Sequence, residues 1–413
     1  MSSEARSLAA TSGKEPPHDK KMKKQSPATE PTPISILSLP EDLLINCLSR
    51  VSRLYHPVLR RVSKRFRATV SSPELYATRW RQNRAEKCIY LYIRYPLDPK
   101  TYWLTLSRLP SRNTANGSTG YEVEQIPCPN YLRPAQSSTL VSVGSDVYKI
   151  GGANHLHECK IWKRNYCVSV CVLDCRTHTW RQAPSMGLAR NANSTATLFD
   201  GKIYVAGGCD EDYVSKPNWI EAFDLETQTW APVTNPRIFW LHEEDRVKGF
   251  EAKLVTLEGK LYIFGDESAV YNPEEDKWSE LGRDVSRMFW AASKCHCVID
   301  DVLFLWDKHS RVFKWYDSKS DSWKDLIGIE GLPELSPDPR VCRVEMVDLG
   351  GKIGFLWSEY LYTSTNQECR IWCAEITFER RDGDEMSGKV EWSDFVLRTH
   401  ESCSSFNVVS ASV

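Results

Sequence analysis

Short apolar runs separated by turn residues predict a chain built mainly from β-strands. The clearest example lies between Thr195 and Trp230, where two apolar runs flank the pair Asp200-Gly201. An Asp-Gly pair between β-prone runs predicts a tight hairpin, because glycine accepts the positive φ that such turns require. The second run ends at Gly207-Gly208, a pair that lets two backbone segments approach where a side chain would clash. This stretch is therefore predicted to be a unit of antiparallel strands.

The same unit recurs along the chain. In each copy an acidic or amide residue ends one strand and a tryptophan follows six residues later; the pairs are Asp174/Trp180, Asp224/Trp230, Asn272/Trp278 and Asp317/Trp323. Successive tryptophans lie roughly 45–50 residues apart. A repeat of this length, with several strands and one tryptophan per unit, indicates the blades of a β-propeller.

The glycine pairs make the repeat resemble the kelch family, in which a Gly-Gly pair precedes a strand end and a tryptophan. The match is good around Gly151-Gly152 and Gly207-Gly208, and it weakens at Gly265-Asp266, Trp306-Asp307 and Trp357-Ser358. The resemblance implies a six-bladed kelch-type β-propeller over residues 88–413. The positions expected to be structural in it are Gly151, Gly152, Trp180, Gly207, Gly208, Trp230, Trp278 and Trp323.

Incomplete units stand at both ends of this propeller. Residues 89–93 and 102–106 have strand character with no first half of a blade before them, and residues 107–130 are rich in loop residues. Residues 380–389 form a charged insertion in the last unit, and Phe406–Ala411 is a short strand with no partner of its own. A free sheet edge promotes aggregation and ring closure removes it. We therefore expect Phe406–Ala411 to join the strands at 89–106 and close the ring.

Between residues 38 and 80 the apolar spacing is helical. Ser38 and Glu41 suggest a capping box with Pro40 in the first turn, and Leu44, Cys47, Leu48 and Val51 then fall on one face. A second helix is predicted from near Pro57, with Leu59, Val62 and Phe66 on its face, and a third from Ser72-Pro73-Glu74 that carries Leu75, Tyr76 and Trp80. Three short helices form only a small core, so apolar surface left over would need a partner.

This segment resembles an F-box. Its opening Leu39-Pro40-Glu41-Asp42-Leu43, its middle Ser63-Lys64-Arg65-Phe66 and its end Ser72-Pro73-Glu74-Leu75-Tyr76 match in register. The resemblance implies a small three-helix module over residues 34–84 that binds a Skp-type adaptor of a cullin ubiquitin ligase. The adaptor contacts that it implies are Leu39, Pro40, Leu43, Leu44, Leu48, Pro57, Leu59, Val62 and Phe66. The alternative for several of them, Leu48 and Val62 above all, is that they only pack the helices together.

Composition limits the classes of partner. The 53 basic residues nearly balance the 54 acidic ones, so the overall charge favours neither nucleic acid nor membrane. Residues 50–67 hold seven basic side chains and no acidic one, but they lack interleaved exposed aromatics and a phosphate-binding loop; an acidic protein partner or solvation explains them better than nucleic acid. No apolar run approaches the ~18 residues that span a bilayer, and no secretion signal is evident.

The 14 cysteines are expected to be reduced, which places the protein in the cytoplasm, the nucleus or both. Residues 1–33 are expected to be a disordered tail, in which residues 20–24 are either a nuclear-import signal or solvated lysines.

The sequence contains only weak signals for a metal site or a catalytic site. Cys295-His296-Cys297 lies in an alternating strand, where the two thiols share one face, and it lacks a second pair at zinc spacing. His155, His157 and Cys159 lie in a loop, with Cys167 nearby as a possible fourth ligand. No Gly-x-Ser-x-Gly, phosphate loop or His-Glu-x-x-His motif occurs. We expect no metal, no cofactor and no catalytic residue.

The loops of the propeller are then the candidate binding surface, because the strands form a rigid frame. Side chains of the kind that anchor protein interfaces occur in the longest loops; they are Trp162, Arg164, Tyr213, Trp240 and Arg246. Together the two resemblances imply a plant-type F-box/kelch-repeat protein. Such a protein would be the substrate-recognition subunit of an SCF-type ligase, with the module on the adaptor and the loops on a target protein. The alternatives are a kelch-fold enzyme or small-ligand sensor with a metal in the channel, and a scaffold unlinked to ubiquitin.

Overall fold

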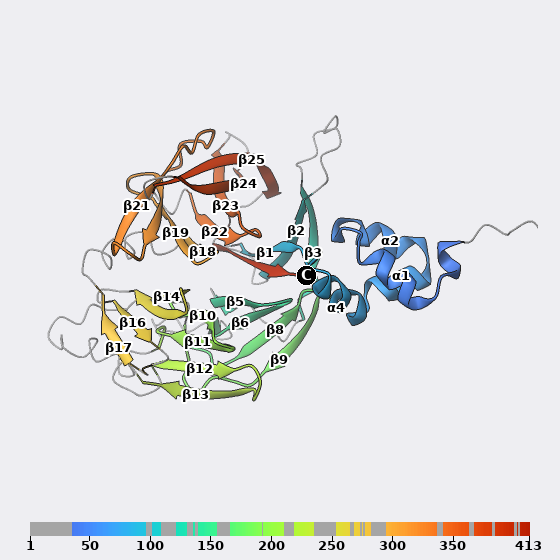
Figure 1. Cartoon of the computed structure of the whole chain (residues 1–413), viewed down its shortest axis with the longest axis horizontal. Helices are drawn as coiled ribbons and strands as arrows, with labels where there is room; N and C mark the ends of the chain where they lie inside the picture. Colours follow the sequence, from blue (N-terminus) through green and yellow to red (C-terminus); the bar gives the residue numbers. More distant parts are fainter. Residues whose placement is uncertain are drawn as a thin grey trace, which may run out of the picture.

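The structure is a computed structural model, and it describes most of the chain after the amino-terminal tail. The described residues are 35–95, 101–108, 121–129, 135–136, 139–154, 166–191, 193–209, 219–234, 253–264, 268–272, 275, 277–281, 295–336, 342–362, 367–381, 385–399, 403 and 405–413. A helical module comes first and a propeller of strands follows, as Figure 1 shows. The predicted tail, residues 1–33, lies outside the described residues.

Four short α-helices and two 3-10 turns make up the helical module. In chain order they are η1 (Ile36–Ser38), α1 (Glu41–Leu48), η2 (Arg53–Tyr55), α2 (His56–Val62), α3 (Lys64–Val70) and α4 (Pro73–Arg81). The core of the module consists of five buried side chains, with Ile45 and Leu59 packed against them; the five are Leu44, Leu48, Phe66, Val70 and Leu75.

Two details of the helix prediction were wrong. The single second helix is two helices, because Ser63 has an extended backbone and its hydroxyl accepts a hydrogen bond from the amide of Phe66 at 3.0 Å, which starts α3. The capping box at Ser38 does not form: the Ser38 hydroxyl donates to the carbonyl of Ser35, and Pro40 is the N-cap residue of α1. The third predicted start was right, since the Ser72 hydroxyl accepts from the amide of Leu75.

The strands of the propeller form groups of four in the described residues. The first group in sheet order is β26 (Ser405–Ser412), β1 (Lys87–Arg94), β2 (Thr101–Arg108) and β3 (Tyr121–Ile126). The second is β5 (Thr139–Val143), β6 (Asp146–Ile150), β8 (Val170–Asp174) and β9 (Thr179–Ala183). The third is β10 (Thr195–Phe199), β11 (Lys202–Ala206), β12 (Ile220–Asp224) and β13 (Thr229–Val233). The fourth is β14 (Lys253–Leu257), β15 (Lys260–Phe264), β16 (Ala269–Asn272) and β17 (Lys277–Glu280).

An eight-stranded sheet supplies the last two groups. One half is β18 (His296–Ile299), β19 (Val302–Asp307), β20 (Val312–Asp317) and β21 (Ser322–Ile327). The other half is β22 (Val344–Asp348), β23 (Ile353–Tyr362), β24 (Gln367–Arg381) and β25 (Glu385–Thr399). The halves join through two parallel pairs, Leu326 with Met386 and Ile327 with Ser387. A small separate pair consists of β4 (Ala135–Gln136) and β7 (Ala153–Asn154).

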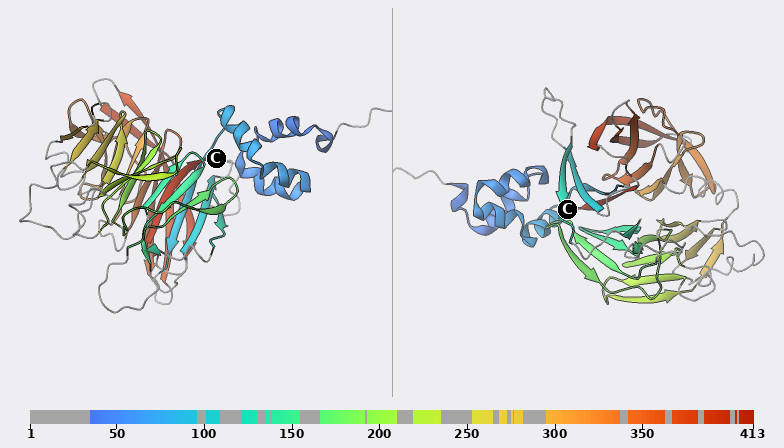
Figure 2. Two further views of the ribbon diagram at one scale, coloured as in Figure 1. Left: turned by 90° about the horizontal axis from the view of Figure 1, so that it is seen from below. Right: turned by 180° about the vertical axis from the view of Figure 1, so that it is seen from behind.

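The innermost strands form a closed cycle. Each contacts the next in the order β26, β5, β10, β14, β18 and β22, and β22 contacts β26 again. Figures 1 and 2 show the sheets set around this ring, with the helical module projecting beside β1 and β3. The predicted mainly-β propeller is thus the observed fold, and the described strands fall into the grouping that six blades would give.

The last strand of the chain closes the ring as expected. β26 pairs antiparallel with β1 from Lys87/Ser412 to Arg94/Ser405, so the first group combines the end of the chain with the first strands after the module. The backbone of Val413 then exchanges two hydrogen bonds with Glu86, at 2.8 and 2.9 Å. The carboxyl terminus therefore lies at the base of the helical module (Figure 1).

Two sequence predictions about the ends of the propeller were wrong. Residues 107–130 are not only loop, because Tyr121–Ile126 forms β3, the outermost strand of the first group. As a result Trp103 lies on the third strand of its group, whereas the repeat tryptophans lie on the fourth. Residues 380–389 do not interrupt the last unit: apart from 382–384, which lie outside the described residues, they continue the hairpin of β24 and β25.

The repeat residues act locally as the pattern predicted. Asp200 and Gly201 both have positive φ and join Phe199 to Lys202 in a two-residue hairpin turn. A Cβ on Gly208 would lie 2.6 Å from the amide nitrogen of Ser194, so only glycine permits this close approach.

The repeat tryptophans lie partly buried on outer strands, where three of them also link neighbouring blades. The indole nitrogens of Trp180, Trp230 and Trp278 donate to carbonyl oxygens just after the outer strand of the preceding group. The acceptors are Pro127 at 3.1 Å, Pro184 at 2.8 Å and Thr234 at 2.7 Å. Each of these three tryptophans therefore packs within its own blade and is hydrogen-bonded to the preceding blade.

Candidate functional site

Exposed apolar side chains concentrate on the helical module. Of the eight large apolar side chains that are exposed in the described residues, six belong to the module; they are Ile36, Leu43, Tyr55, Val58, Val62 and Trp80. The other two, Val168 and Ile327, lie on the propeller. Single exposed apolar residues are common, whereas such a concentration on a small module is typical of an interaction surface.

Three of these side chains follow one another along α2. Tyr55 immediately precedes the helix, and Val58 and Val62 follow three and seven residues later. Residues three or four apart lie on the same face of a helix. Val58 and Val62 are 60% and 56% exposed, so this face of α2 is not used to pack the chain itself.

The predicted adaptor contacts divide into surface and core. Pro40, Leu43 and Val62 are exposed, and Leu43 is 50% exposed although its neighbour Leu44 is fully buried. The half-buried members are Leu39, Pro57 and Leu59. The buried members, Leu44, Leu48 and Phe66, form the core of the module.

Burial thus distinguishes the core members of this set from Val62. In this structure Leu44, Leu48 and Phe66 pack the helices against one another and present no surface to a partner. Val62, expected to be a packing residue in the alternative interpretation, is instead exposed. Tyr55 and Val58 were not among the predicted contacts. The signal that could have found them is their helical spacing, since Tyr55 and Val58 precede the predicted contact Val62 by seven and four residues.

The opening segment of the module is held by a basic side chain. The Arg65 guanidinium on α3 donates to the backbone carbonyl of Leu39 at 2.6 Å. This hydrogen bond fixes the Leu39-Pro40 segment at the start of α1, beside the exposed Leu43. Part of the basic segment 50–67 therefore serves the internal structure of the module.

A buried arginine fastens the module to the chain that leads into the propeller. Arg79 on α4 is 1% exposed and donates to the carbonyl oxygens of Ser49, Val51 and Arg84 at 3.2, 2.6 and 2.9 Å. It also pairs with the Glu86 carboxylate at 2.8 Å. That carboxylate lies beside the Glu86–Val413 backbone pair, so one arginine joins the module to the closing strand.

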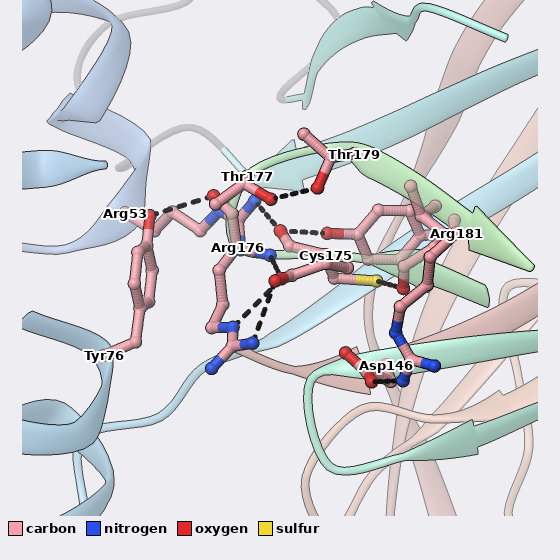
Figure 3. A network of polar contacts seen from close by, with 11 residues as sticks. Arg53, Tyr76, Asp146, Cys175, Arg176, Thr177, Thr179 and Arg181 are labelled. Atoms are coloured by element: carbon pink, nitrogen blue, oxygen red, sulfur yellow. Dashed lines mark hydrogen bonds and ion pairs between the residues drawn. The ribbon is translucent and has the colours of Figure 1, made fainter. Parts of the chain in front are cut away.

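Two further side chains reach from the module to the turn between β8 and β9, as Figure 3 shows. The Arg53 guanidinium donates to the carbonyl of Cys175 and lies 3.1 Å from Nε2 of His178. The Tyr76 hydroxyl lies 3.2 Å from the carbonyl oxygen of Arg176. Arg176 is in turn held by Asp174 through a two-pronged ion pair. We call the contacts of Arg53, Tyr76, Arg79 and Glu86 the seam.

Apolar packing continues across the seam. Tyr76 is 5% exposed and belongs to one cluster with buried residues of the first two blades; these include Cys88, Tyr90, Leu173, Cys175, Val409 and Val413. Burial raises the pKa of Tyr76 and of Cys88, so both remain protonated and neutral at physiological pH. The module is therefore seated on the propeller by an interface with an apolar centre, which favours a fixed relative orientation.

The predicted substrate anchors lie outside the described residues. These are Trp162, Arg164, Tyr213, Trp240 and Arg246. His155, His157 and Cys159 lie outside them as well. Cys295 and Cys297 are buried on one face of their strand, as predicted, and burial raises the pKa of both thiols. Among the described side chains, no three His, Cys, Asp or Glu residues converge as metal ligands. No helix in the described part is long and apolar enough to cross a membrane.

Comparisons with known proteins agree with this architecture. Residues 36–78 match the model of the F-box domain, and residues 103–397 match that of the FKB95, Kelch-repeats domain. A putative F-box/kelch-repeat protein of Arabidopsis thaliana is 53% identical over 93% of this chain and 94% of its own length. Two F-box/kelch-repeat proteins of the same plant are 47% and 40% identical, over 100% and 93% of this chain and 99% and 96% of their own lengths. With an F-box-like module seated on a propeller of kelch type, the chain belongs to the F-box/kelch-repeat proteins.

Proposed function

We propose that this chain is the non-catalytic substrate-recognition subunit of an SCF-type cullin ubiquitin ligase. In this proposal the helical module binds a Skp-type adaptor, and through it the cullin, while loops of the propeller bind a target protein that is then ubiquitinated and degraded by the proteasome. The observation that carries the proposal is the concentration of exposed apolar side chains on the module. A protein that binds no partner there would leave this surface in contact with water.

The proposed adaptor surface consists of Leu43 on α1 together with Tyr55, Val58 and Val62 along α2. The segment Leu39-Pro40 borders it, and Pro57 and Leu59 are partly accessible. The buried Leu44, Leu48 and Phe66 would support this surface from below without touching the adaptor.

In this proposal the seam keeps the helical module in a fixed orientation on the propeller. A recognition subunit accelerates ubiquitin transfer by holding a lysine of the target near the transfer site, which raises the effective concentration. A module that swung freely on a linker would spread the target over a large volume and lose this gain. The ion pair, hydrogen bonds and apolar contacts of the seam oppose such motion.

The decisive experiment replaces exposed apolar residues of the module by aspartate. Val62→Asp and Leu43→Asp should each weaken binding of a Skp-type adaptor by about 2–4 kcal/mol, roughly 30- to 1,000-fold in Kd, if they are central to the interface. Because both side chains are at least half exposed, the melting temperature should hardly change. Val168→Asp is the matched control, since Val168 is an exposed valine on the propeller. Adaptor affinity that is equal in all three variants and the wild type would refute the proposed surface.

The same proposal places the protein in the cytoplasm, the nucleus or both, where cullin ligases act. Target capture would need no cofactor, because binding and proximity supply the whole effect. Purification of the chain from cells with the proteasome inhibited, followed by mass spectrometry, would identify the target. Binding of the target should depend on the propeller and should be unaffected by Val62→Asp. That result would show that target binding and adaptor binding use separate surfaces.

A further inference from the structure

A hollow lies between α2 of the helical module and the first two blades. Part of it is open to solvent. The module contributes Arg53, His56 and Arg60 to its lining, the β8–β9 turn contributes His178, and β3 contributes Glu122 and Glu124. Val58 and Val62, which we propose bind the adaptor, do not line this hollow, whereas their neighbour Pro57 does.

Several buried nitrogen atoms of the residues that line the hollow have no hydrogen-bond partner within the described part of the chain. They are Nη1 of Arg53, both ring nitrogens of His56 and Nε of Arg60, and all of them are buried. The whole His56 residue is only 2% exposed. A buried polar group without a partner costs about 1–3 kcal/mol, and native proteins retain few of them. Nitrogen atoms without partners on three residues around one hollow indicate that a ligand forms the missing hydrogen bonds.

The hollow is also cationic at this end. The nearby Arg79 is neutralised by Glu86, but no carboxylate lies within ion-pair distance of the Arg53 or Arg60 side chain among the described residues. Burial, and then the positive charges of Arg79, Arg53 and Arg60, lower the pKa of His56 to about 3. Two guanidinium groups without a direct carboxylate partner among the described residues therefore lie at this end of the hollow, which Glu122 and Glu124 also line, and an anion between the arginines would pair with them.

Arg53 is held in place without such an anion. One of its terminal nitrogens, Nη2, donates to the carbonyl of Cys175 and lies beside His178, which leaves Nη1 for a ligand. A guanidinium fixed in this way binds an oxyanion with little further loss of side-chain entropy. Guanidinium groups form strong, often two-pronged hydrogen bonds with phosphate oxygens.

We propose that this hollow binds a small phosphate-class oxyanion between Arg53, His56 and Arg60. The phosphate can be inorganic, or it can be the phosphoryl group of a small molecule whose remainder extends towards the mouth. Glu122 and Glu124 on the opposite wall repel further negative charge, so the site would favour a single phosphate over a polyphosphate. The ligand would join module and propeller at the seam.

The test uses the full chain, inorganic phosphate and two adjacent arginines. Phosphate should raise the melting temperature of the wild type relative to chloride at equal ionic strength, and titration calorimetry should show binding. Arg60→Gln should weaken phosphate binding roughly 10- to 100-fold, because a charge-assisted hydrogen bond is lost. Arg61→Gln is the matched control: it removes the same charge from the same helix, at an exposed position that does not line the hollow.

A second variant gives a result of the opposite sign. Glu122→Gln removes a like charge from the far wall, so it should tighten phosphate binding and extend it to pyrophosphate. The proposal is overturned if phosphate does not bind the wild type, or if Arg60→Gln and Arg61→Gln weaken its binding equally, as general screening of charge would do. Should Arg60→Gln fail to fold, Glu122→Gln decides alone, and unchanged affinity in that variant would count against the site. Binding of phosphomonoesters and of inorganic phosphate to the wild type, measured side by side, distinguishes the two sources of the ligand.

Discussion

Replacement of Arg79 by methionine tests whether one buried side chain holds the helical module together and onto the propeller. Methionine retains a flexible stem of similar length but removes four donated bonds, to three backbone carbonyls and to Glu86. Loss of one partner of a buried ion pair costs about 3–5 kcal/mol. Because the Glu86 side chain is 38% exposed and water can solvate it, we expect the lower end, about 3 kcal/mol.

A loss of this size should be visible because the module has a small core of five buried side chains. A change of 1 kcal/mol shifts the melting temperature of a domain of 60–100 residues by roughly 4–8 °C. If the module melts as its own unit, a loss of about 3 kcal/mol should therefore lower its melting temperature by more than ~10 °C relative to the wild type. Differential scanning calorimetry should then resolve an early transition ahead of the propeller. Binding of the proposed Skp-type adaptor should fall with the fraction of folded module.

Arg81→Met is the control for this experiment. Arg81 lies on the same helix and is exposed, and among the described residues it donates only within α4, to the Ala77 carbonyl and the Thr78 hydroxyl. Its replacement should cost no more than ~0.5 kcal/mol. If Arg79→Met melts and binds the adaptor like Arg81→Met, the seam does not depend on this side chain and the reasoning is refuted.

Two further predictions concern closure of the ring and protonation. Deletion of residues 404–413 removes β26 with the buried Phe406 and Val409, each worth about 1.5–3 kcal/mol of apolar burial, so thermal unfolding should occur at a sharply lower temperature; an unchanged melt would show that the ring does not need this strand. The pKa of His56 is lowered to about 3 by burial and neighbouring arginines, whereas the unfolded chain takes up this proton near pH 6.5. In phosphate-free buffer, stability should therefore fall as the pH drops from 6.5 towards 3. Urea titrations at pH 7 and pH 5 should show a smaller difference for His56→Gln than for the wild type, and equal differences would contradict the assignment.

The sequence was informative where the determining chemistry is local. A two-residue hairpin depends on the φ that its own residues can adopt, so Asp200-Gly201 revealed its turn without knowledge of the rest of the chain. The spacing from Asp224 to Trp230 likewise reflects two adjacent strands and the turn between them. Ring closure by the last strand was also predictable, because an unpartnered strand at each end of a propeller leaves few other solutions.

Features that depend on contacts between distant segments of the chain were harder to predict from the sequence. The break at Ser63 was missed because Leu59, Val62 and Phe66 keep helical spacing across it, although Ser63 itself is a good N-cap residue. The strand Tyr121–Ile126 was missed because β2, the one strand that pairs with it in the described residues, lies beyond a long polar stretch.

The candidate site shows the same limit most sharply. Leu43 and Leu44 are adjacent leucines in one helix, and a family resemblance assigned both to the adaptor. One is half exposed and the other is fully buried. Apolar spacing identifies faces of a helix, but only the packing of α1 against its neighbours decides which face belongs to the core. The hollow at the seam was beyond prediction, because its lining comes from residues more than a hundred positions apart.

The pairing of Val413 with Glu86 has a consequence for biosynthesis. A ribosome makes the amino-terminal helices before the strand that completes the first blade. The helices can fold early, but their contact with the blades is complete only after β26 and Val413 have left the exit tunnel. Products truncated before β26 would therefore hold the helical module less firmly on the propeller. For the same reason, a reporter fused directly after Val413 would crowd this joint, whereas one placed before the first helix would leave it undisturbed.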